Sequence, residues 1–148
     1  MIQLLRTNAE HPDFTALVKC LDADLAQRDG EDHDFYAQFN QINTIRFAVV
    51  AYENETPVGC GAIKAYSPDA MEVKRMYVLP EHRGKGIATT ILSELENWAG
   101  ELYYARCVLE TGKKQPEAIE LYKKAGYRVI PNYGQYAGVE NSVCFEKV

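Results

Sequence analysis

Several features that would each indicate a particular class of protein are absent from this sequence. No run approaches the roughly 18 apolar residues that span a membrane, and the start shows no secretory pattern. The three histidines are dispersed, without a cluster of metal ligands around them. The four cysteines form no Cys-x-x-Cys pair. We therefore expect a cytoplasmic protein with reduced thiols, no metal and no contact with membrane.

A net positive charge is also missing. The chain has 16 Lys and Arg against 21 Asp and Glu, a net charge of −5 at pH 7, which argues against a nucleic-acid partner. The stretch from Lys74 to Lys85 is an exception, because it holds four basic residues and one acid, Glu81. A positive pocket on an acidic protein suits a small anionic ligand.

The order of apolar patterns and turns predicts one α+β domain over residues 1–148, without repeat or linker. We expect strands at 2–6, 45–52, 57–66, 71–79, 104–110, 127–130 and 141–147, and helices at 10–27, 32–41, 87–99 and 116–125. The first four strands form an antiparallel meander, and the strand after the third helix runs parallel to the central one. Gly59 and Gly61 indicate a bulge or a close backbone approach, and Gly100 and Gly126 are expected to end helices.

The chain is organised around residues 71–88, which read as a strand, a short turn and a helix. Pro80 stops the strand, and Arg83-Gly84-Lys85-Gly86 makes a turn with two positive charges. Glycines let the backbone approach a ligand closely, and the first N–H groups of a helix have no internal partners. The stretch therefore predicts a phosphate site. Neither the P-loop pattern nor the dinucleotide fingerprint fits it.

Two motifs carry a family resemblance. Arg83-x-x-Gly86-x-Ala88 resembles the acyl-CoA pyrophosphate loop of the GNAT superfamily of N-acetyltransferases, and the segment 115–127 resembles the second GNAT motif, Asn-x-x-Ala-x-x-x-Tyr-x-x-x-Gly-Phe/Tyr, with Gln115 in the asparagine place. The resemblance covers nearly the whole chain. It implies a mixed, mostly antiparallel sheet of about seven strands flanked by about four helices.

The resemblance also implies acetyl-CoA as acyl donor and a primary amine, a small molecule by preference, as acceptor. Tyr122 is the implied acid for the leaving thiolate, although a core tyrosine would show the same spacing. A backbone N–H near Tyr77 or Val78 would meet the oxyanion. The residues implied to bind the donor are Met76, Tyr77, Val78, Arg83, Gly84, Lys85, Gly86, Ile87, Ala88, Thr89, Gln115 and Tyr122.

Three glutamates are candidates for the base that takes the proton of the amine. Glu72, at the start of the central strand, is the first choice, acting through water; the alternative is a salt bridge to Lys64 or Lys74. Glu110 is second and Glu140 third.

The acceptor side is less defined. The acidic residues between Asp22 and Asp34 form either a solvated face or a lip that attracts a cationic acceptor, and Tyr133 and Tyr136 either stack on a substrate or cover the core. A non-catalytic acyl-CoA sensor and a protein-interaction module are the alternative functions. A homodimer is possible by family resemblance.

Overall fold

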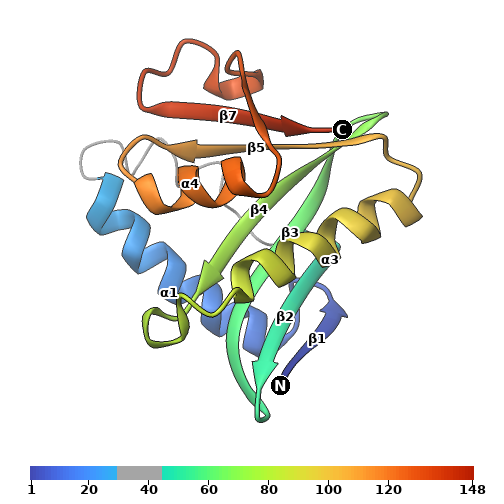
Figure 1. Cartoon of the computed structure of the whole chain (residues 1–148), viewed down its shortest axis with the longest axis vertical. Helices are drawn as coiled ribbons and strands as arrows, with labels where there is room; N and C mark the ends of the chain where they lie inside the picture. Colours follow the sequence, from blue (N-terminus) through green and yellow to red (C-terminus); the bar gives the residue numbers. More distant parts are fainter. Residues whose placement is uncertain (30–44) are drawn as a thin grey trace.

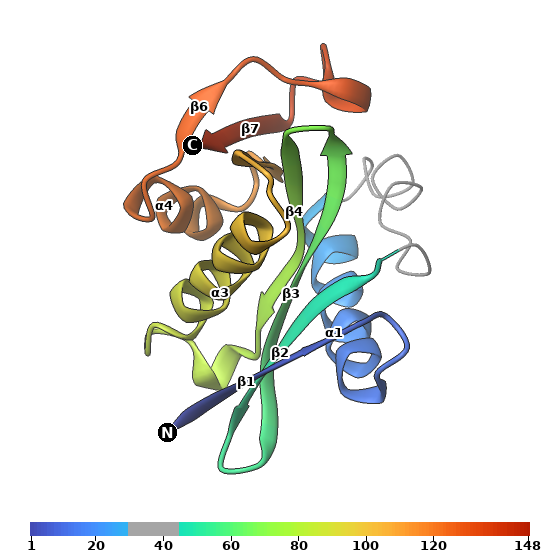
Figure 2. The same ribbon diagram turned by 90° about the vertical axis from the view of Figure 1, so that its right-hand side faces the viewer.

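The structure is a computed structural model that describes residues 1–29 and 45–148. In this part of the chain a seven-stranded sheet has the strand order β1-β2-β3-β4-β5-β7-β6 and helices on both faces (Figures 1 and 2). The strands are β1 (Ile2–Thr7), β2 (Phe47–Glu53), β3 (Thr56–Ser67), β4 (Ala70–Val78), β5 (Arg106–Gly112), β6 (Arg128–Ile130) and β7 (Ser142–Lys147). The helices are α1 (Pro12–Asp29), α3 (Ile87–Glu101) and α4 (Pro116–Lys124), with 3₁₀ turns η2 (Pro80–His82) and η3 (Gly134–Tyr136).

The predicted α+β architecture is confirmed. Strands β1 to β4 form the antiparallel meander, and β4–β5 is the parallel pair. Most element boundaries lie within one or two residues of the predicted ones. The second of the four predicted helices, at 32–41, lies outside the described residues.

The sheet is buried on both faces at β2, because the middle of this strand is apolar. Val49 and Ala51 of β2 belong to the core shared with α3 and α4, whereas the alternate residues Ala48 and Val50 belong to the core shared with α1. All four side chains are fully buried. Figure 2 shows α1 on one side of the sheet and α3 and α4 on the other. Period-two alternation thus fills two separate cores from one strand.

A bulge in β4 determines the geometry of the site. Cys60 of β3 pairs with Tyr77, but Ala62 pairs with Lys74, so β4 carries one extra residue between these two positions. Arg75 lies there, with a φ of 61°. Gly61 faces the bulge, and a Cβ atom on it would lie 2.5 Å from the sulfur of Met76. The predicted bulge therefore lies opposite Gly61, and the close backbone approach occurs at Gly59, where a Cβ atom would lie 3.0 Å from the carbonyl oxygen of Tyr77.

Strands β4 and β5 separate beyond the bulge. Their parallel pairing covers only Ala70–Glu72 against Arg106–Val108, and the two strands diverge after it (Figure 1). The edge of β4 that faces β5 is therefore open from Val73 onward. A sheet that opens between its two central strands leaves room for a ligand.

One predicted helix end is wrong. Helix α3 continues through Gly100 to Glu101, and the left-handed residue that follows it is Tyr103, with a φ of 68°. The side chain of Tyr103 is exposed to solvent, so the cost is the intrinsic one of about 1–2 kcal/mol. Gly126 does follow α4 in a left-handed conformation, with a φ of 98°, as predicted.

Candidate active site

Two adjacent cavities lie where β4 and β5 separate. The loop cavity, of about 310 Å³, is lined by the turn before α3. The carboxylate cavity, of about 110 Å³, is lined by Glu72 and Glu110. The two cavities share five lining residues, Leu21, Met76, Gln115, Ala118 and Tyr122. A ligand in one can therefore meet a ligand in the other at these residues.

The loop cavity brings together eleven of the twelve residues predicted to bind the donor. They are Met76, Tyr77, Val78, Arg83, Gly84, Gly86, Ile87, Ala88, Thr89, Gln115 and Tyr122. The twelfth, Lys85, does not line the cavity; its ammonium group lies 3.4 Å from Oε1 of Glu53, and its side chain is half exposed. Helix α1 also contributes Leu21 and Asp24 to the wall. No pattern in the sequence indicated that contribution, since helix periodicity shows only which residues face the sheet.

The backbone of the loop is arranged for an anion. Gly84 and Gly86 have φ values of 82° and 80°, and nothing lies within 4 Å of the place where a Cβ atom would be. Within the described part of the chain, the N–H groups of residues 84–89 have no hydrogen-bond acceptor. Helix α3 begins at Ile87 without a side-chain cap. These N–H groups and the positive end of the helix dipole together suit a phosphate.

Two contacts hold this loop in place from its sides. Arg83 Nε donates a hydrogen bond of 2.8 Å to the carbonyl of Val78, and its guanidinium lies 5.4 Å from the ring centroid of Tyr77. On the other side, Glu53 lies 3.4 Å from Lys85 Nζ and 3.5 Å from His82 Nδ1. Burial opposes ionisation of this carboxyl, but Lys85 and His82 together hold the pKa of Glu53 below its usual value. Sequence reasoning missed Glu53, which is thirty residues before the loop.

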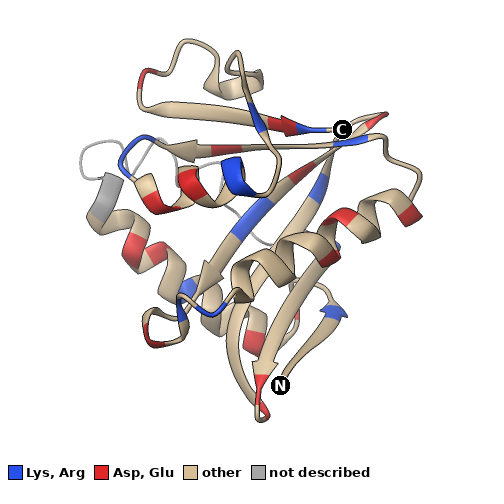
Figure 3. Cartoon of the chain, in the orientation of Figure 1, with Lys and Arg blue, Asp and Glu red and all other residues tan. Residues whose placement is uncertain are grey.

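The basic residues of the central stretch are mostly matched by carboxylates. Three of them form ion pairs: Lys74 with Glu72, Arg75 with Asp22 and Lys85 with Glu53. The fourth, Arg83, donates its hydrogen bond to a backbone carbonyl. Figure 3 shows the Lys and Arg positions of the loop before α3 in blue. The attraction for an anion therefore depends on main-chain N–H groups and the helix end more than on lysine side chains.

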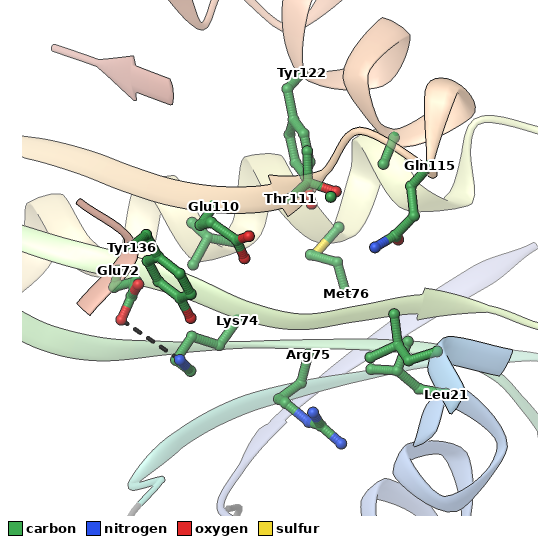
Figure 4. A pocket seen from close by; sticks show the side chains of 14 residues that line it. Leu21, Glu72, Lys74, Arg75, Met76, Glu110, Thr111, Gln115, Tyr122 and Tyr136 are labelled. Atoms are coloured by element: carbon green, nitrogen blue, oxygen red, sulfur yellow. Dashed lines mark ion pairs between the residues drawn. The ribbon is translucent and has the colours of Figure 1, made fainter. Parts of the chain in front are cut away.

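Tyr122 joins the two cavities. Its ring packs in the core at 5.8 Å from the ring of Tyr127 and 6.0 Å from that of Phe145, and Figure 4 shows it reaching from α4 toward the gap between the strands. The structure therefore confirms the core position, and because the same ring lines both cavities, the role of acid stays a prediction. Burial, and to a smaller extent the charge of Glu110, raises the pKa of Tyr122, so the phenol is protonated at neutral pH.

Glu72 and Glu110 differ in what surrounds them. The hydroxyl of Tyr133 donates a 2.6 Å hydrogen bond to Glu72 Oε2, and Lys74 Nζ lies 3.6 Å from Oε1, so the salt bridge is to Lys74 and not to Lys64. Glu110 is close enough to Tyr122 and Tyr136 for its charge to raise the pKa of both phenols, where burial is the larger cause. Figure 4 shows both carboxylates in the cavity wall.

Other predicted residues fall in different places. Glu140 is exposed and lines neither cavity. Tyr136 is buried and lines the carboxylate cavity. Tyr133 does not line this cavity, but its hydroxyl donates a hydrogen bond to Glu72, which does. In the predicted acidic lip, Asp22 pairs with Arg75 and Asp24 lines the loop cavity. The lip's acidic residues after α1, which are Glu31, Asp32 and Asp34, lie outside the described residues.

The described residues contain neither a cluster of metal ligands nor a helix that could span a membrane. No group of three or more His, Cys, Asp or Glu side chains in residues 1–29 and 45–148 is placed to hold a metal ion. Over the same residues, no helix is both long and apolar enough to cross a membrane.

Comparison with known proteins agrees with the geometry. The model of the "Acetyltransferase (GNAT) family" matches residues 12–127. An "IAA acetyltransferase" from Azospirillum brasilense is 38% identical over 104 residues, which is 70% of this chain and 67% of that protein. Two other curated relatives, from Schizosaccharomyces pombe and Escherichia coli, are 33% and 40% identical, and each match covers 50% of the relative's own length.

Solved structures show the same fold. A Klebsiella pneumoniae protein assigned as an acyl-CoA N-acyltransferase superposes with a TM-score of 0.83 and 28% identity, covering 99% of this chain and 97% of that one. A GNAT family acetyltransferase from Elizabethkingia anophelis, solved with acetyl-CoA bound, has a TM-score of 0.70 and 19% identity, covering 98% and 96%. The family model spans most of the chain and the fold matches throughout, so this protein belongs to the GNAT family of acetyltransferases.

Proposed function

We propose that this protein transfers an acetyl group from acetyl-CoA to a primary amine of a small molecule, by direct attack of the amine on the thioester. The observation that carries the proposal is the position of Tyr122 between two cavities of different chemistry. One cavity presents N–H groups that suit a diphosphate, and the other presents carboxylates that suit an amine. The small volume of the second, about 110 Å³, favours a small acceptor.

The loop would hold the donor through its backbone. The N–H groups of residues 84–89 would donate hydrogen bonds to the diphosphate oxygens, and Gln115 extends its amide into the path between the cavities (Figure 4). The opened edge of β4 near Tyr77 and Val78 offers main-chain N–H groups to the oxyanion that forms when the thioester carbonyl is attacked. When bound, acetyl-CoA supplies the activated acyl group.

The chemistry then needs two proton movements. A carboxylate takes the proton from the amine, and a hydroxyl donates one to the departing sulfur. We propose Tyr122 for the second task. For the first we propose Glu110 rather than Glu72, because Glu110 lines the carboxylate cavity close enough to Tyr122 for its charge to raise the pKa of that phenol. In this arrangement Glu72 positions Lys74 and Tyr133.

The experiment is the Tyr122→Phe substitution, assayed for acetyl-CoA-dependent acetylation of an amine panel. We expect kcat to fall by about a hundredfold or more, while Kd for acetyl-CoA changes by less than about threefold, since the ring remains in the core. Tyr127→Phe is the matched control, because Tyr127 is a buried tyrosine that lines neither cavity. An unchanged kcat in Tyr122→Phe would show that the acid is misassigned.

Two outcomes would replace the proposal. If acetyl-CoA stabilises the wild-type protein but no amine is acetylated, the protein is a non-catalytic acyl-CoA sensor. If acetyl-CoA at about a hundred times a typical Kd gives no stabilisation, where about 2.7 kcal/mol is expected, the chain is an interaction module.

A further inference from the structure

We infer that the acceptor is a short zwitterion, a primary amine with a carboxylate a few atoms away, as in an α-amino acid. This inference rests on the proposed function, because it places the acceptor in the carboxylate cavity. It is carried by two cations, Lys74 and Arg75, which line that cavity together with the two glutamates.

The bulge in β4 explains why two consecutive cations line one cavity. Successive side chains of a regular strand point to opposite faces, and Val73 and Tyr77 do belong to cores on opposite faces of the sheet. Residues 73 and 77 would share a face in a strand without the extra residue. The bulge at Arg75 shifts the alternation by one, so Lys74 and Arg75 both border the carboxylate cavity.

These cations keep hydrogen-bonding capacity. The side chain of Arg75 is 1% exposed and donates through Nη2 to Asp22, but among the described residues its Nε has no acceptor. The side chain of Lys74 is 10% exposed, and its ammonium lies 3.6 Å from Glu72, beyond hydrogen-bond length. Cations buried without full hydrogen bonding are costly. A bound carboxylate would supply the missing acceptors.

The side of the cavity formed by β5, across from the two cations on β4, suits an ammonium group (Figure 4). Glu110 lines it together with Tyr122, one of the five residues shared with the loop cavity, and the attacking nitrogen must lie there. An acceptor with a second cation, such as a diamine, would place that cation beside Lys74 and Arg75, whose carboxylate partners Glu72 and Asp22 are already engaged, so it would add an unmatched charge. An acceptor with a carboxylate in the same place would be attracted. The charges therefore discriminate between classes of amine, in favour of the zwitterion.

The size of the cavity limits the distance between the two charges. Its volume, about 110 Å³, is roughly a third of that of the loop cavity. Tyr136 from η3 and Leu25 from α1 belong to its wall. A cavity of this size suits a small acceptor whose amine and carboxylate are close together in the molecule, as in an α-amino acid.

The test compares matched acceptors on the wild-type protein. The panel contains L-alanine, L-leucine and L-phenylalanine, the amide of each, the amine that lacks the carboxyl group, and 1,5-diaminopentane. We expect kcat/KM for at least one amino acid to exceed that of its amide and its amine by about tenfold or more, as a hydrogen bond between charged groups predicts. A panel in which amides, simple amines or the diamine are acetylated as well as the amino acids overturns the inference and leaves the proposed function intact.

A substitution then assigns the carboxylate to Lys74. In Lys74→Gln, the ratio of kcat/KM for the amino acid to that for the matched amine should fall about tenfold. Lys64→Gln is the matched control, because Lys64 is an exposed lysine opposite Glu72 on β3 and lines neither cavity, so the ratio should be kept. If Lys74→Gln lowers both values equally, Lys74 only neutralises Glu72 and the inference is wrong. If acetyl-CoA binds but no member of the panel is acetylated, the proposed function falls and the inference falls with it.

Discussion

Replacing Gly61 by alanine tests the close contact between β3 and the bulge. A Cβ atom there would lie 2.5 Å from Met76 Sδ, 2.9 Å from Ile91 Cγ2 and 2.9 Å from Leu95 Cδ1. Contacts below 3.0 Å are not tolerated, so three side chains must move together. Two of them, Ile91 and Leu95, are fully buried in the core between the sheet and α3, where neighbouring side chains leave little space.

Overpacking of this kind costs about 1–3 kcal/mol, and about 0.5–1 kcal/mol of that is offset because alanine restricts the unfolded chain more than glycine does. We therefore expect Gly61→Ala to lower the free energy of unfolding by about 1–2 kcal/mol, measured by urea denaturation. Gly100→Ala is the matched control. Gly100 lies in the last turn of α3 with nothing within 4 Å of its Cβ position, so the same substitution should stabilise by up to about 1 kcal/mol.

The contact also has a consequence for activity, because Met76 lines both cavities. If its sulfur is displaced toward the gap between β4 and β5, the acyl end of the donor loses space, and kcat should fall more than Kd for acetyl-CoA rises. A Gly61→Ala protein with unchanged stability and unchanged kcat would refute the claim that the bulge is packed tightly against β3. A stable protein with lowered kcat would show that Met76 alone moves.

Three further predictions follow from other contacts. Glu110→Gln should lower kcat by about a hundredfold or more and remove the acidic limb of the pH–rate profile, whereas Glu72→Gln should cost about tenfold; the reverse order would return the base to Glu72. Glu53→Gln should raise KM for acetyl-CoA about two- to fivefold by releasing Lys85 and His82, and Glu55→Gln, in the adjoining turn, should not. Arg6→Ala should lower Tm by about 2–4 °C, because Arg6 makes two 2.8 Å hydrogen bonds to Glu101 and one to Glu94. The hydrogen bonds from Arg6 lower the pKa of Glu101. The stabilisation by Arg6 is therefore present above about pH 4.3, the pKa of a free glutamate, and is lost as pH falls. The difference in Tm between the wild type and Arg6→Ala should shrink at pH 3.

The part of the site that the sequence predicted is the part built from backbone. Gly84 and Gly86 are needed because both residues have positive φ, and Pro116 and Gly126 mark the two ends of α4, so the loop and the helix that carries Tyr122 can be read from local rules. The family and the acyltransferase class predicted from these motifs are confirmed by the family match. The roles of the individual residues remain predictions.

The remaining features depend on contacts between distant segments. Glu53 meets Lys85 across a turn, two strands and η2, and Asp22 of α1 meets Arg75 across the face of the sheet. The bulge is also invisible in a sequence, because Lys74-Arg75 reads as an ordinary polar step of a strand until the register with β3 is known. The helix end predicted at Gly100 is wrong because helices frequently end at a glycine but do not have to.

The environment of Tyr122 links the acid to the acceptor. Burial and the charge of Glu110 both raise the pKa of the phenol, which makes a complete proton transfer to a thiolate, whose own pKa is about 8.5, unfavourable in the protein alone. An ammonium group beside Glu110 offsets that charge and lowers the pKa of Tyr122 again. The phenol thus becomes a better acid when an amine is in place. A zwitterion does this without adding net charge to a cavity that already balances Glu72 and Glu110 against Lys74 and Arg75, whereas a diamine would add a second cation to it.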